Sequence, residues 1–183
     1  MNALAALGTL VAAGFAPPGP SLAEDLATGR FAELLAALAE AHGMPTPALP
    51  VPPFSQLETA YVGLFVNHPE GVPVPPYVGY AQDGRLFGPS FDRLLDFLEA
   101  HGVVPRPEFS DLPDHIAAVG EALALLAERD PPAARRLARE FLLPWFARYR
   151  SPLEDADPTG FYAALAGFVH DVLSREVNGE AQT

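Results

Sequence analysis

Apolar side chains that recur every three or four residues, in segments separated by prolines, constrain the fold of this chain more than any other feature. The clearest stripes lie in residues 57–65, 91–98 and 116–126. This spacing places the apolar side chains on one face of an α-helix. Period-two alternation long enough for a strand does not occur, and the sequence has no internal repeat. The sequence therefore predicts an all-α fold, a bundle of helices.

Prolines and short polar residues mark where these helices begin and end. Residues 17–20 (PPGP) should end a first helix, and residues 45–53 should form a stiff connector. Ser55, followed three residues later by Glu58, has the spacing of a capping box. Asp130 precedes two prolines and predicts the start of a further helix.

Four other positions predict details of the helices. Ser21 is a candidate N-cap for a helical stretch that continues to about Gly43, with a break near Gly29. Pro144 should kink the helix in which it lies or start a new turn.

The composition is that of a folded globular domain. The chain has 183 residues, of which 49% are apolar and 19% are charged, so residues 1–183 are expected to form a single domain with a real core. It has no cysteine, which excludes a disulfide framework, a thiol nucleophile and cysteine-ligated metal sites.

The charge balance limits the classes of partner. All eleven basic residues are arginine, against 23 acidic residues, and the net charge is −12. Nucleic acid is a poor partner for such a surface, whereas a cationic partner suits it, and an acidic surface that serves only solubility is the alternative. Without lysine the chain has no Schiff-base or P-loop lysine.

The first sixteen residues are apolar enough to imitate a secretory signal. They lack a positively charged start, since the first arginine is Arg30, and the apolar run is too short to span a bilayer. We interpret them as a buried first helix, with a cleaved signal as the alternative.

Residues 67–89 are rich in proline and glycine and yet contain Tyr77, Tyr80 and Phe87. A structureless loop of this length is unusual inside a compact domain. The segment is therefore predicted to be a functional loop or to pack locally.

An Asp-His pair, Asp114 and His115, follows a proline where an apolar helix is expected to begin. The five histidines are scattered without metal-ligand spacing, so no metal site is predicted. Adjacent helical residues point about 100° apart, which makes the pair a poor acid/base dyad. Because Asp111 could also cap the helix, one acid is available for another role, and capping and partner binding both remain open.

Three motifs in a fixed order carry a resemblance to a known family. They are YVGLF with Tyr61, Leu64 and Phe65, VPPYVGY with Pro76 and Tyr77, and DLPDH with Asp111, Asp114 and His115. Together with the later FLLPWF and GFYAALAGF segments, they resemble the TorD, DmsD and NarJ family of redox-enzyme maturation chaperones. The resemblance covers about residues 57–173, and the sequence LPDH within it is closer to the NarJ-like branch of the family.

The resemblance implies a cytoplasmic, all-helical chaperone that is not an enzyme and needs no cofactor of its own. Its partner would be the apo catalytic subunit of a molybdopterin oxidoreductase, the twin-arginine signal peptide of that subunit, or both. Nucleic acid binding and stable membrane insertion are not expected, and the protein would be a monomer or a domain-swapped dimer. The resemblance places client binding on Tyr61, Leu64, Phe65, Pro76, Tyr77, Asp111, Asp114 and His115. A small helical enzyme that uses Asp114 and His115, and a purely structural adaptor, remain the alternatives.

Overall fold

The computed structural model describes residues 2–104 and 111–178, and this part of the chain is all-α. The helices are α1 (Ala3–Phe15), α2 (Pro20–Thr28), α3 (Arg30–Ala41), α4 (Phe54–Tyr61), α5 (Val78–Asp83), α6 (Pro89–Ala100), α7 (Ile116–Arg129), α8 (Pro131–Leu137), α9 (Leu143–Ala156) and α10 (Phe161–Asn178). Two π-helical segments, Val62–Val66 and Ala138–Leu142, continue α4 and join α8 to α9. The described residues contain no strand, and the all-α prediction is confirmed.

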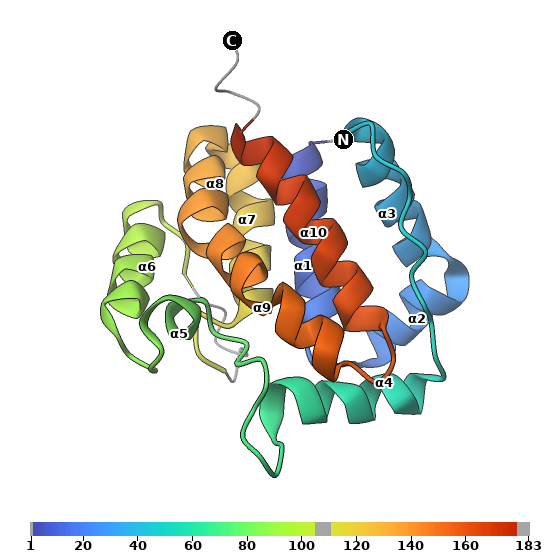
Figure 1. The fold of residues 1–183 in the computed structure, drawn as a ribbon. Coiled ribbons are helices and arrows are strands. Elements are labelled where there is room, and N and C mark those ends of the chain that lie inside the picture. The colour runs from blue at the N-terminus through green and yellow to red at the C-terminus, as the bar shows by residue number, and fades with distance from the viewer. Residues whose placement is uncertain (1, 105–110, 179–183) are drawn as a thin grey trace.

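Helix α1 lies in the middle of the bundle (Figure 1). It packs against α7, α10 and α3, and Leu7, Leu10 and Val11 are fully buried. The prediction of a buried first helix is therefore confirmed. Helix α4 lies across one end of the bundle, and α5 and α6 lie together at one side of it (Figure 1).

Two glycines bring α1 and α7 unusually close. A Cβ atom at Gly8 would lie 2.4 Å from the backbone nitrogen of Ala124, and one at Gly120 would lie 2.8 Å from that of Ala12. Real side chains do not tolerate such distances, so the contact between the two helices requires glycine at both positions.

Several predicted helix boundaries are confirmed. Gly29 adopts a left-handed conformation, with φ of +83°, and separates α2 from α3. The Asp130 carboxylate accepts a hydrogen bond from the Ala133 N–H at the start of α8. Pro144 lies in the first turn of α9, directly after a π-helical segment.

The two predicted serine caps are wrong. Helix α2 begins at Pro20 and α4 at Phe54, so Ser21 and Ser55 lie inside the first turns, and neither helix has a side-chain cap. In α2 the proline occupies the first helical position, where its fixed φ and missing N–H are favourable, and Gly19 rather than Ser21 takes the N-cap position, two residues earlier.

The proline-rich segment 67–89 is ordered and includes the short helix α5. The Trp145 indole Nε1–H donates to the carbonyl of Pro75 at 3.0 Å, and the Val74 N–H donates to the carbonyl of Leu64 at 3.1 Å. These bonds fix the segment against α9 and the π-helical segment Val62–Val66, so its local packing is confirmed.

None of the described helices is by itself long and apolar enough to cross a membrane. Helices α1 and α2 reach the required length and composition only together, and they are bent by 117° with respect to each other.

Candidate functional site

A cavity of about 390 Å³ collects residues from segments far apart in the sequence. Its lining comprises Pro17, Tyr61, Phe65, Val66, Val72, Pro75, Pro76, Tyr77, Tyr80, Leu86, Asp111 and His115. Six of the eight predicted site residues are in this set, whereas Leu64 and Asp114 are not. The cavity is mostly aromatic and aliphatic, and the Asp111 carboxylate, the His115 imidazole and three tyrosines bring polar atoms to it.

A short backbone bridge holds the two central motifs together. The Val78 N–H donates to the carbonyl of Asp114 at 2.9 Å, and the Ile116 N–H donates to the carbonyl of Pro76 at 2.7 Å. Tyr77 and His115 are thereby paired as an isolated antiparallel bridge. This pairing explains why the proline-rich segment and the Asp-His turn meet at one site.

His115 is buried and caps α7. Its Nδ1 accepts a hydrogen bond from the Ala117 N–H at 3.1 Å, so in the neutral imidazole the proton resides on Nε2. Nε2 lies 3.3 Å from the Tyr61 hydroxyl and 4.0 Å from Asp111 Oδ2. Burial lowers the pKa of His115, and the Asp111 charge opposes this effect.

Asp111 is the accessible acid of the cavity, with its side chain 40% exposed. Its Oδ1 accepts from the Tyr77 hydroxyl at 3.0 Å and from the Leu112 N–H at 2.6 Å. Burial, followed by this hydrogen bond to Asp111, raises the pKa of Tyr77 to about 12. Burial and the Asp111 charge also raise the pKa of Tyr61. Both phenols are therefore neutral at physiological pH.

Asp114 lies behind the cavity rather than in its wall. It is 2% exposed, and its Oδ2 accepts from the Gly79 N–H at 3.2 Å. Its Oδ1 has no hydrogen-bond partner among the described residues. Burial raises the pKa of Asp114 to about 6, opposed by the hydrogen bond from Gly79.

The side chains of Asp114 and His115 therefore interact with different groups. The Asp114 carboxylate accepts a hydrogen bond from the start of α5, while the His115 imidazole lies 4.0 Å from the Asp111 carboxylate. Asp111 does not cap α7, because its carboxylate bonds to Leu112 and Tyr77. The cap of this helix is His115 itself, so the expectation that Asp111 provides a second cap is wrong.

The YVGLF motif contributes one wall of the cavity and part of the core. Leu64 is buried behind the cavity, whereas Tyr61 and Phe65 are 4% exposed and line it. The ring centroids of Tyr61 and Phe65 are 5.0 Å apart, and both rings pack on Tyr162. The rings therefore support the fold and also border the cavity.

Six of the lining residues are not among the site residues expected from the motifs, although four of them lie in the predicted functional loop 67–89. The six are Pro17, Val66, Val72, Pro75, Tyr80 and Leu86. Tyr80 is one of the three aromatic residues in the proline-rich segment 67–89, and this signal could have identified it. No such signal marks Pro17, which reaches the cavity only through the packing of the bundle.

In residues 2–104 and 111–178 no group of three or more His, Asp or Glu side chains could hold a metal ion.

The family model described as the nitrate reductase delta subunit matches residues 23–151, more than half of the chain. A protein of Haemophilus influenzae described as the probable Tat proofreading chaperone DmsD is 32% identical over 108 residues, which are 58% of this chain and 53% of that protein. The chaperone protein TorD of Shewanella loihica is 30% identical over 115 residues, 61% of this chain and 49% of that protein. The matches thus span about half the length of these two relatives.

The fold has a counterpart among solved structures. The crystal structure of a proposed redox enzyme maturation protein from Archaeoglobus fulgidus superposes with a TM-score of 0.63 and 22% identity, covering 95% of this chain and 94% of that one. At this identity the similarity shows that the two proteins share a fold.

Proposed function

Because the chain belongs to the nitrate reductase delta subunit family, we propose that it is a chaperone for the maturation of a molybdopterin oxidoreductase. It binds the apo catalytic subunit, and the twin-arginine leader where the subunit has one, while the cofactor is inserted. The proposed compartment is the cytoplasm, where such a subunit is assembled. The names of the DmsD and TorD relatives support a chaperone role.

The observation that carries the proposal is the gathering of Tyr61, Phe65, Tyr77, Asp111 and His115 around one cavity. Aromatic and aliphatic walls accept apolar side chains. The exposed Asp111 carboxylate can accept charge-assisted hydrogen bonds from a guanidinium group. A segment with both arginine and apolar side chains fits this lining, as in the grooves that recognise amphipathic peptides.

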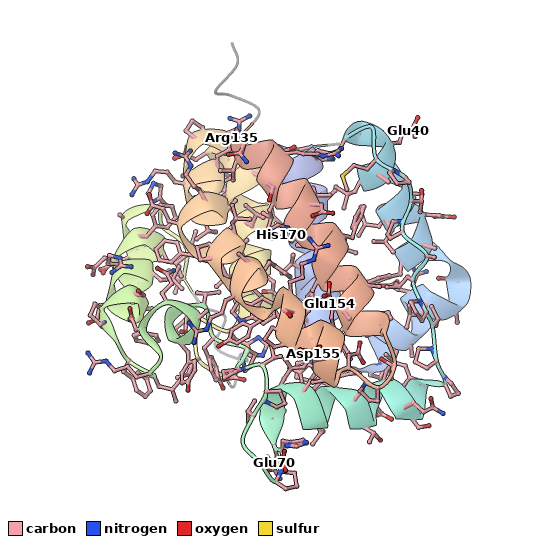
Figure 2. The ribbon with its side chains drawn as sticks, in the orientation of Figure 1. Glu40, Glu70, Arg135, Glu154, Asp155 and His170 are labelled. Carbon is pink, nitrogen blue, oxygen red and sulfur yellow. The ribbon has the colours of Figure 1, made fainter. Side chains whose placement is uncertain are left out.

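The net charge of −12 favours a cationic partner, but the acidic residues do not mark one place on the surface where it would bind. Exposed acids lie on several parts of the surface, as Figure 2 shows for Glu40 near the end of α3, Glu70 on the loop after α4, and Glu154 and Asp155 near the end of α9. Since the acidic charge is spread in this way, it attracts a basic segment to the whole molecule. The cavity lining, with Asp111 as its acid, is then what positions the segment.

The proposal is tested by affinity capture followed by mass spectrometry. The tagged protein is expressed in its own cells under conditions that induce molybdoenzymes, and we expect it to retain a molybdopterin oxidoreductase catalytic subunit without its cofactor. A Y77A variant should retain less of this subunit, whereas L125A, on the exposed side of α7, should retain as much as the wild type. Capture of no oxidoreductase, or only of the cofactor-loaded enzyme, would contradict the proposal.

A further inference from the structure

Large exposed apolar side chains are concentrated beside the cavity. Among the described residues they are Val51, Val62, Val66, Leu86, Phe87, Val104 and Leu125. Four of these seven fall in two short stretches, 62–66 and 86–87, and Val66 and Leu86 line the cavity itself. An apolar patch that continues a cavity is typical of a binding surface.

The backbone of Phe87 is in an unfavourable conformation. With φ of +53° it is the single non-glycine residue of the described chain in the left-handed region. A residue with a Cβ atom is sterically disfavoured in the left-handed region. Phe87 stays 62% exposed, and its ring contacts Phe91 edge-on at 5.2 Å between ring centroids, so burial of the residue does not offset this cost.

A set of hydrogen bonds at the base of the loop enforces the conformation. The Asp83 carboxylate accepts from both the N–H and the hydroxyl of Ser90, each at 2.7 Å. A Cβ atom at Gly88 would lie 2.4 Å from Asp83 Oδ2. Only glycine therefore fits beside this carboxylate at position 88. Arg93 adds a bond to the Ser90 hydroxyl at 2.8 Å. The loop 84–88, closed in this way, holds Leu86 and Phe87 in solvent beside the cavity.

We propose that the loop 84–88 is a preformed apolar anchor for the client segment whose arginine meets Asp111. Leu86 and Asp111 line the same cavity, so an occupant that contacts both presents a cation at one end and apolar side chains at the other. The exposed Arg85 repels basic residues from the loop and thereby sets this direction. The inference rests on the proposed function and adds to it the surface that selects the apolar part of the client.

The test uses F87G and F87N, because glycine and asparagine are the residues that accept a positive φ most readily. We expect both variants to melt at the same temperature as the wild type or a higher one, since the backbone cost is relieved. Their affinity for a synthetic peptide with an Arg-Arg pair followed by a leucine- and alanine-rich run should fall about tenfold, as for the loss of an aromatic anchor. Replacement of the peptide's arginines by glutamine should weaken its binding to the variants by the same factor as to the wild type.

L125A is the matched control, because Leu125 is also an exposed apolar residue but lies outside the cavity lining. Its peptide affinity should equal that of the wild type. If F87N binds the peptide as tightly as the wild type, or if its melting temperature falls, the anchor is disproved while the proposed function stands. If the wild type binds neither the peptide nor a captured catalytic subunit, both proposals are overturned.

Discussion

At the scale of single residues, Asp114 illustrates how burial alters a carboxyl group. One oxygen accepts the Gly79 N–H and the other has no partner among the described residues. A Cβ atom at Gly79 would lie 3.0 Å from this carboxylate and 3.1 Å from the Phe91 nitrogen, so glycine permits the close approach of α5, α6 and the Asp-His turn. The ionised carboxylate is incompletely solvated at this position, which is why its pKa rises.

The raised pKa of Asp114 predicts a pH dependence of stability. Since the pKa rises from its ordinary value of 3.8 to about 6, the folded protein binds this proton more tightly than the unfolded chain. The resulting stabilisation is fully present below pH 3.8 and is lost as the pH rises through about 6. We expect D114N, whose amide oxygen still accepts the Gly79 N–H, to gain stability relative to the wild type over this window, by at most ~3 kcal/mol.

Urea unfolding of both proteins at several pH values between 4 and 7 measures this difference. His115 has a lowered pKa and favours the unfolded state as the pH falls, but it is present in both proteins, so its contribution cancels. Parallel stability curves for the two proteins would contradict the prediction.

His115 serves both as the cap of α7 and as part of the cavity wall, and two substitutions separate these roles. H115A removes the acceptor for the Ala117 N–H and leaves a buried space, so a loss of ~2–4 kcal/mol in unfolding free energy is expected. Asparagine is a favourable N-cap, and H115N should recover about 1 kcal/mol of this loss. Maturation of the captured oxidoreductase should be impaired in both variants, and normal maturation with H115N would show that the histidine is only a cap.

At the scale of the elements, Gly8 at the crossing of α1 and α7 and Gly63 in the π-helical segment after α4 should respond differently to substitution by alanine. G8A would force a methyl group to within 2.4 Å of the α7 backbone, and we expect a loss of at least ~2 kcal/mol. Gly63 has no atom within 4 Å of its Cβ direction, and in a helical conformation G63A should be neutral or stabilising by up to ~1 kcal/mol. Thermal unfolding compares the two variants, and equal melting temperatures would show that the helices can separate without cost.

The periodicity of the sequence predicted the long helices correctly because packing on one core requires an apolar face. It missed α5, since the six residues VGYAQD are too few to show a period. It also missed the two π-helical segments, which are continuous in sequence with the α-helices beside them. For the site, the motifs indicated the right segments, but the tertiary bridge between Tyr77 and His115 decides which side chains line the cavity and places Asp114 behind it.

At the scale of the whole molecule, the net charge and the cavity make different contributions to partner binding. The buried α1 lies in the middle of the bundle and packs against α3, α7 and α10 (Figure 1). The cavity is lined by residues of α4, of α5 and of the turn that ends in His115, the N-cap of α7. The net charge of −12 acts at long range on a basic partner, whereas the cavity acts only on contact. Binding should therefore consist of an ionic and an apolar contribution that respond differently to salt.

Calorimetric titration of the Arg-Arg peptide at low and high salt tests this division. Exposed charges are screened over a Debye length of ~8 Å at physiological ionic strength, and Asp111 is partly exposed, so the arginine peptide should bind more weakly as salt rises. A peptide with glutamine in place of both arginines should bind with an affinity that salt hardly changes. D111N keeps an acceptor for the Tyr77 hydroxyl but removes the charge, and it should reduce the difference between the two peptides by up to about fivefold in affinity. Equal affinities in all four conditions would mean that the charge serves only solubility, and absence of binding in all of them would direct recognition to the folded body of the catalytic subunit.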